Sequence, residues 1–168
     1  MLRHRVLAPV LAALALATAG QAQTASSPPA ARSEVSPNGR IAMHVGALVM
    51  EDLRQFIPDE ATRGAIYMRM LLLAKQEAIG ASCAAYTLDQ QRMTATMIRT
   101  MRPISEGVSK DVGTANLGRA LRQYHTLLGG ELAQFAYDPG GYCDHAGQVF
   151  EELGGYAEDR SILVLKRA

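Results

Sequence analysis

The sequence has two cysteines, Cys83 and Cys143, and their pairing would constrain the fold more than any other feature. In an exported protein an even number of cysteines indicates disulfide bonding, and two cysteines allow a single intramolecular pairing. The bond would close a loop of about 60 residues and stabilise the fold by about 4 kcal/mol, by reducing the entropy of the unfolded chain. The alternative is a redox or metal-binding pair. However, CxxC spacing is absent, and Cys143-Asp144-His145 does not complete the CxxCH motif of haem attachment.

The N-terminal segment, residues 1–22, has the three regions of a secretory signal peptide. Arg3 and Arg5 supply positive charge, residues 6–20 are apolar, and small residues lead up to Ala22. The apolar stretch is shorter than the about 20 residues that span a bilayer. We therefore expect cleavage near Ala22 and a periplasmic or secreted protein. The alternative is a hydrophobic first helix of the domain.

Residues 23–39 contain three prolines and many small polar residues, which predicts a flexible linker. The folded domain is then residues 40–168, where 18 uninterrupted apolar residues never occur, so we expect no membrane span after signal removal. The full chain has 17 basic and 16 acidic residues. Removing Arg3 and Arg5 leaves 15 basic residues against the same 16 acidic ones. This balance argues against a nucleic-acid binder that relies on bulk charge.

The pattern of hydrophobic residues favours an all-α domain, a small bundle of four to five helices with one intramolecular disulfide. A strand over residues 41–49 is an alternative reading of the first segment. Residues 162–165 form either a last helical turn, which we favour, or an edge strand. The expected helices cover residues 40–56, residues 61–85, a segment from a capping box at 87–90 to about 101, a segment carrying Leu117 to Phe135, and residues 144–153.

Glycine and proline mark the expected breaks between these helices. Pro103 should end or kink the third helix, and residues 105–113 should form a loop, with Asp111 or Thr114 capping the next helix. Gly129-Gly130 should interrupt the fourth helix through a kink or a close crossing of another helix. Residues 138–141, Asp-Pro-Gly-Gly, predict a turn.

Three methionines, Met93, Met97 and Met101, recur at four-residue spacing and so share one face of a helix. We expect this face to be core, because methionine fills irregular interiors. One alternative is a contact face for a partner. Another is a site for a soft ion such as Cu(I), which thioethers bind.

Candidate catalytic chemistry is sparse. His125 and His145 have no second ligand at helical spacing, and the sequence has no HExxH, GxSxG or SxxK motif. We therefore predict no catalytic residue, no metal site and no cofactor. Arginines far outnumber lysines, and they suit an anionic ligand, although the composition of the source organism explains the excess more simply.

These observations predict an exported, non-enzymatic binding or structural factor of the bacterial cell envelope. Its partner would be an unknown envelope protein or a small ligand. The possible ligand or partner face comprises Met93, Met97, Met101, His125 and His145. The alternatives are a periplasmic copper carrier, a chaperone-like helical protein, or an enzyme of unrecognised class. Residues 88–92 resemble, over that short stretch, the L-T-x-x-Q repeats of small helical periplasmic chaperones, with Asp89 in place of the threonine.

Overall fold

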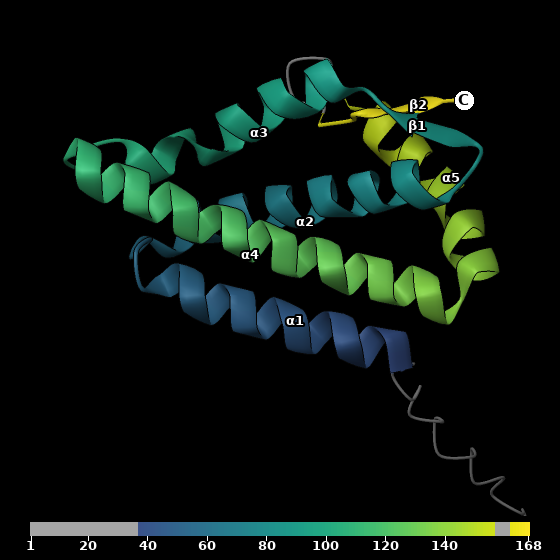
Figure 1. Cartoon of the computed structure of the whole chain (residues 1–168), viewed down its shortest axis with the longest axis horizontal. Helices are drawn as coiled ribbons and strands as arrows, with labels where there is room; N and C mark the ends of the chain where they lie inside the picture. The colour runs from purple at the N-terminus through teal and green to yellow at the C-terminus, as the bar shows by residue number, and fades with distance from the viewer. Residues whose placement is uncertain (1–36, 157–161) are drawn as a thin grey trace, which may run out of the picture. The chain divides into compact units, whose positions relative to one another are not determined.

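The computed structural model describes residues 37–156 and 162–168, and it confirms the predicted small all-α bundle (Figure 1). The predicted signal peptide and the predicted linker up to residue 36 lie outside the described residues. The first helix begins at Pro37, inside the segment predicted as linker. In chain order the elements are α1 (Pro37–Arg54), α2 (Glu60–Ser82), β1 (Tyr86–Leu88), α3 (Gln90–Ser105), α4 (Lys110–Tyr137), α5 (Pro139–Gly154) and β2 (Leu165–Arg167).

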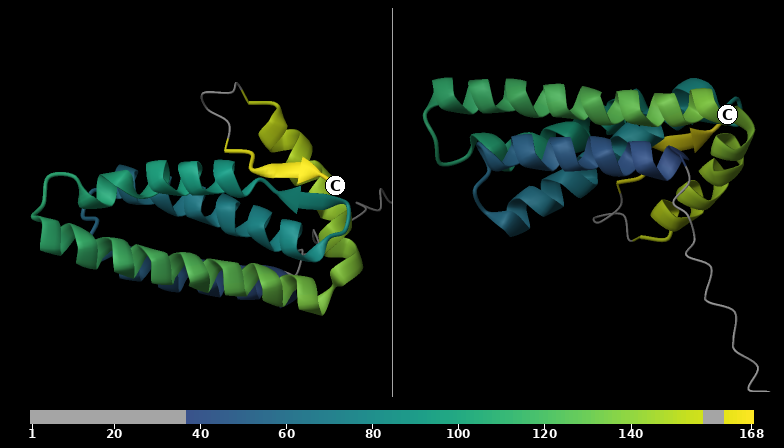
Figure 2. Two further views of the ribbon diagram at one scale, coloured as in Figure 1. Left: turned by 45° about the horizontal axis from the view of Figure 1, so that its top comes forward. Right: turned by 90° about the horizontal axis from the view of Figure 1, so that it is seen from below.

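Helices α2 and α4 form the centre of the bundle. They pack against each other, and α1 and α3 each pack against both of them (Figures 1 and 2). Helix α5 and the two strands lie together at one end, next to the C-terminal part of α2. The main core contains side chains from all four long helices and from the C-terminal segment, including Leu53, Met70, Met101, Leu127 and Val164.

Aspartate and serine side chains set the helix starts, at positions that differ in part from the prediction. Asp89, not Thr87, caps α3 by accepting a hydrogen bond from the Arg92 amide at 2.9 Å, so the predicted capping box is wrong. Thr87 is instead part of β1. Helix α4 is capped by Ser109 and not by either of the predicted residues, Asp111 and Thr114, which both lie inside the helix.

Pro103 does not end α3 at residue 101, because the helix continues to Ser105. A proline in the last helical turn removes one backbone hydrogen bond and leaves little helix beyond it to disrupt. Similarly, the turn predicted at residues 138–141 is the start of α5. The Asp138 carboxylate accepts a hydrogen bond from the Gly141 amide at 3.0 Å, and Pro139 occupies the first helical position, where its missing N–H costs nothing.

Helix α4 runs without interruption through Gly129 and Gly130, so the predicted break is wrong and the predicted close crossing is correct. A Cβ atom on Gly130 would lie 3.4 Å from Val45 Cγ1 on α1, whereas nothing lies within 4 Å of a Cβ on Gly129. The second glycine therefore permits the approach of α1, and the first has no such packing role.

The C-terminal tail forms a strand, not the helical turn that we favoured. β2 pairs with β1 in antiparallel register, with Tyr86 opposite Arg167 and Leu88 opposite Leu165. Next to this pair lies a second hydrophobic cluster between α2 and α5, with Ile79, Cys83, Ala146, Val149, Leu153 and Leu165 as its buried members.

Candidate functional site

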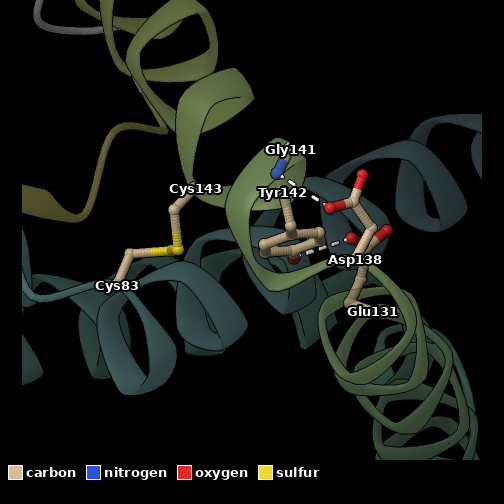
Figure 3. The surroundings of a disulfide bond; sticks show 6 residues. All are labelled: Cys83, Glu131, Asp138, Gly141, Tyr142 and Cys143. Carbon is tan, nitrogen blue, oxygen red and sulfur yellow. Dashed lines mark hydrogen bonds between the residues drawn. A yellow bond between two sulfur atoms is a disulfide. The ribbon is translucent and has the colours of Figure 1, made fainter.

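The disulfide between Cys83 and Cys143 is present, as predicted (Figure 3). Cys83 is the C-cap residue that directly follows α2, and Cys143 lies in the first turns of α5. Their Cα atoms are 5.6 Å apart, within the usual range for a disulfide. Both cysteines of the chain are in this bond. The bond joins the end of α2 to the start of α5 and thereby orients the residues around Cys143.

The methionine stripe has two roles. Met93 and Met101 are members of the main core, whereas Met97 is half-buried. Met97 and Met101 also line a groove of about 340 Å³ between α3 and α4. The complete lining is Met97, Ile98, Met101, Arg102, Ser105, Leu117 and Leu121.

This α3–α4 groove has exposed apolar walls. Ile98 on α3 is 61% exposed and Leu121 on α4 is 44% exposed. Isolated exposed hydrophobic residues are ordinary on protein surfaces, but a concave group of them marks a binding surface. The groove is therefore the first candidate site.

Arginine is the main charged residue along the groove, and acidic residues occur at its Ser105 end, where Glu106 follows α3 and Asp111 lies in the first turn of α4. Helix α3 carries Arg92, Arg99 and Arg102 and no acidic residue, and residues 112–130 of α4 carry Arg119 and Arg122 and no acidic residue. Within the described part of the chain, no acidic side chain lies within 4.0 Å of any of these guanidinium groups. Five of the fourteen arginines of the sequence thus lie on the two helices that form the groove.

The two histidines of the predicted face do not join the methionines. His125 is exposed on α4, where its ring lies 5.9 Å from that of Tyr124. His145 is exposed on α5 and lines a different cavity. Across residues 37–156 and 162–168, no cluster of three or more histidine, cysteine, aspartate or glutamate side chains has the geometry to hold a metal ion.

A second candidate site contains charged and polar side chains, of which the sequence analysis named His145 alone as a candidate site residue. Two adjoining cavities, of about 200 and 210 Å³, share Lys75 of α2 and Gln134 of α4 as lining residues. The first is also lined by Glu131, which is 5% exposed, and the second by Tyr142, whose hydroxyl donates a hydrogen bond to Glu131 Oε2 at 2.9 Å (Figure 3). We refer to the two together as the Glu131 cavity.

The tyrosines near Glu131 show its electrostatic effect. Burial, together with the nearby Glu131 carboxylate, raises the pKa of Tyr142 above its ordinary value. The pKa of Tyr67, which lines the first cavity, is raised by burial and then by Glu131. Both phenols are therefore protonated at neutral pH and available as hydrogen-bond donors.

One signal in the sequence pointed to this site. Glu131 follows Tyr124 and Leu127 at helical spacing, so it continues the apolar face of α4 as a charged residue. A carboxylate on a buried face requires compensation by donors or cations. Its partner Tyr142 comes from another helix, and local spacing does not identify such a residue.

Two further observations concern the whole set of described residues and the resemblance of the chain to known proteins. No helix within the described residues is long and apolar enough to cross a membrane. No family model, no curated protein and no solved structure matches this chain.

Proposed function

We propose that the protein is an exported, non-enzymatic binding factor of the bacterial cell envelope, and that it docks a segment of a partner protein in the α3–α4 groove. Export is supported by the signal-peptide pattern of residues 1–22 and by the disulfide, because stable disulfides form in oxidising compartments.

The observation that carries the binding proposal is the concave apolar surface of the α3–α4 groove. Its lining is methionine, isoleucine and leucine, with Arg102 and Ser105 as the polar members. Methionine and arginine are both enriched in protein interfaces, and flexible methionine side chains adapt to different apolar partners. Antiparallel helices with an apolar groove between them suit an amphipathic helix, which inserts side chains at helical spacing.

The charge of the groove defines the partner segment further. Arg102 lines the groove, and Arg99, Arg119 and Arg122 lie exposed on the same two helices. The fitting occupant is an amphipathic segment whose apolar face is flanked by aspartate or glutamate, since guanidinium groups bind carboxylates. An acidic segment would also be steered toward the groove, and its binding should weaken as salt is added.

Export is tested by sequencing the N-terminus of the protein recovered from the producing cells. We expect a chain that begins near residue 23 in the periplasmic or secreted fraction. Recovery of the uncleaved chain in the cytoplasm, with both thiols reactive toward maleimide, would contradict the export part of the proposal.

Docking is tested by photo-crosslinking in the producing cells. A benzophenone amino acid replaces Ile98 in the groove or, as the control, Met43 on α1, which is 67% exposed. We expect the position-98 probe alone to form an adduct with one envelope protein, and mass spectrometry should map it to an acidic amphipathic segment. The control tests whether an exposed apolar position is sufficient for the same reaction.

A synthetic peptide of the mapped segment then measures affinity in solution. The variant Leu121→Glu places a carboxylate on the groove wall, and we expect it to weaken peptide binding at least about tenfold, or 1.4 kcal/mol. Equal adducts from both probe positions, an adduct with lipid alone, or unchanged affinity of the variant would each refute the docking proposal.

A further inference from the structure

The Glu131 cavity contains a buried carboxylate that forms no close ion pair with any described residue. Glu131 is 5% exposed, and the Tyr142 hydroxyl donates to its Oε2 atom. Within the described residues, its Oε1 atom has no hydrogen-bond donor, and no lysine, arginine or histidine nitrogen lies within 4.0 Å of the carboxylate. Burying a carboxylate without a paired cation costs free energy, and a cation bound beside it would offset that cost.

Space for that cation is present beside the carboxylate. The cavity of about 200 Å³ is lined by Glu131 together with the side chains of Tyr67 and Gln134. Its remaining walls include the aliphatic side chains Ala42, Val45, Leu71 and Leu127. The cavity therefore combines one buried negative charge with an apolar surface, which suits a small cation that carries a short hydrocarbon chain.

The net charge of the whole Glu131 cavity also favours a cation. Its lining contains two carboxylates, Glu131 and Asp138, against one ammonium group, that of Lys75. Asp138 is already engaged as the cap of α5. The exposed imidazole of His145 lines the outer cavity.

The disulfide holds this arrangement together. Cys143 is the neighbour of Tyr142 in the first turns of α5, and its bond to Cys83 joins that part of α5 to α2 (Figure 3). Helix α4 supplies Glu131 and α2 supplies Lys75. The covalent link thus helps to position the phenol that orients the Glu131 carboxylate.

We propose that the Glu131 cavity is a binding site for a small primary aliphatic amine. The ammonium group would donate a hydrogen bond to the free Glu131 oxygen, and the alkyl chain would lie against the aliphatic wall. A charge-assisted hydrogen bond of this kind is about twice as strong as a neutral one. This site is separate from the α3–α4 groove and does not depend on the proposed function.

The test is calorimetric titration of the oxidised full-length mature protein with n-butylammonium. n-Butanol serves as the neutral analogue of the same length, and butyrate as the anion. We expect saturable, one-to-one binding of butylammonium and at least about tenfold weaker binding of the other two compounds. Equal binding of butanol, or no saturable binding of butylammonium, would overturn the proposal.

Two variants locate the site. Glu131→Gln keeps the size of the side chain and an acceptor for Tyr142 but removes the charge, so we expect at least about a tenfold loss of butylammonium affinity. Lys75→Met removes the competing cation from a half-buried position and should tighten binding severalfold. The groove variant Leu121→Glu is the control and should leave butylammonium affinity unchanged.

The lysine variant keeps the proposal falsifiable if Glu131→Gln fails to fold. If butylammonium binds Lys75→Met alone and restores stability that the substitution removed, Lys75 is the native counter-ion of Glu131 and the wild-type cavity is not a ligand site. Unchanged or weaker binding by Lys75→Met would equally refute the proposed charge balance.

Discussion

Gln76 of α2 is hydrogen-bonded to the backbone of Val164, 88 residues later in the chain, and both residues are fully buried. The Gln76 side-chain oxygen accepts from the Val164 amide at 2.7 Å. Its side-chain nitrogen donates to the carbonyl oxygens of Ile162 at 3.0 Å and Leu72 at 3.1 Å. One side chain therefore satisfies two backbone groups of the segment that leads into β2, which is how that segment enters the core.

Replacing Gln76 with leucine should destabilise the fold by about 2–4 kcal/mol, because it leaves the Val164 amide and the Ile162 carbonyl without their partner. Urea denaturation measures this change. The control is Gln123→Leu, which removes an exposed hydrogen bond to Asp52 and should cost less than about 1 kcal/mol. Similar losses in the two variants would contradict the role assigned to Gln76.

Removing the disulfide through Cys83→Ala together with Cys143→Ala should lower the free energy of unfolding by about 4 kcal/mol. The reason is the entropy that the unfolded chain regains when its loop of 60 residues is opened. Denaturation of the wild type with and without reductant provides an independent comparison. A loss below about 1 kcal/mol would show that the link contributes little to stability.

The neighbouring glycines of α4 should respond differently to alanine. Gly129→Ala should stabilise the protein by about 0.5–1 kcal/mol, because alanine favours the helix and open space surrounds the new methyl group. Gly130→Ala gains the same helix propensity but places its methyl group 3.4 Å from Val45, at the close limit of ordinary contact, so it has no open space around it. Thermal denaturation should therefore rank Gly129→Ala above Gly130→Ala, and the reverse order would contradict the close crossing of α1 and α4.

Acid should weaken the protein in part through Asp89. The Lys166 ammonium group, 2.8 Å away, and the Arg92 amide hold the pKa of the Asp89 carboxyl below its ordinary value. A lowered folded-state pKa gives stability that is present above the unfolded pKa of about 3.9 and is lost as the pH falls through the folded value.

The matched variant for this effect is Asp89→Asn, which retains a capping oxygen but has no charge. The wild type should be more stable than the variant at pH 7, and the difference should shrink as the pH falls below about 4. Urea midpoints measured from pH 7 to pH 2 test this. A difference that stays constant with pH would show that the Asp89 charge does not stabilise the fold.

The helices were predictable from the sequence because each has its own periodic pattern. The spacing of Leu117, Leu121 and Tyr124, for example, predicts a helix without knowledge of any other element. The predicted face is only partly buried, because Leu121 is 44% exposed and the buried face of α4 includes Ala120 and Leu127. Helix ends were less accurate. Several neighbouring side chains can cap the same helix N-terminus. Asp89 caps α3 where Thr87 was predicted, and Ser109 caps α4 where Asp111 or Thr114 was predicted. The strand β2 was missed because its partner, β1, lies far away in the chain.

The candidate sites were predictable only in part. The methionine spacing identified a face of α3 that contributes Met97 and Met101 to the groove. It did not show that Leu117 and Leu121 of α4 form the opposite wall, because that depends on how the two helices pack. His125 and His145 were predicted to share a ligand or partner face with the methionines, yet they do not line the groove.

The sequence by itself determined the helical class of this protein and the pairing of its two cysteines. Helical periodicity is a local property, and two cysteines have a single possible intramolecular partner. Tertiary structure alone decided that Glu131 meets Tyr142, that Gln76 binds the C-terminal segment, and that α3 and α4 leave a groove between them. These contacts join residues of different elements, and their geometry arises only when the helices pack around a common core.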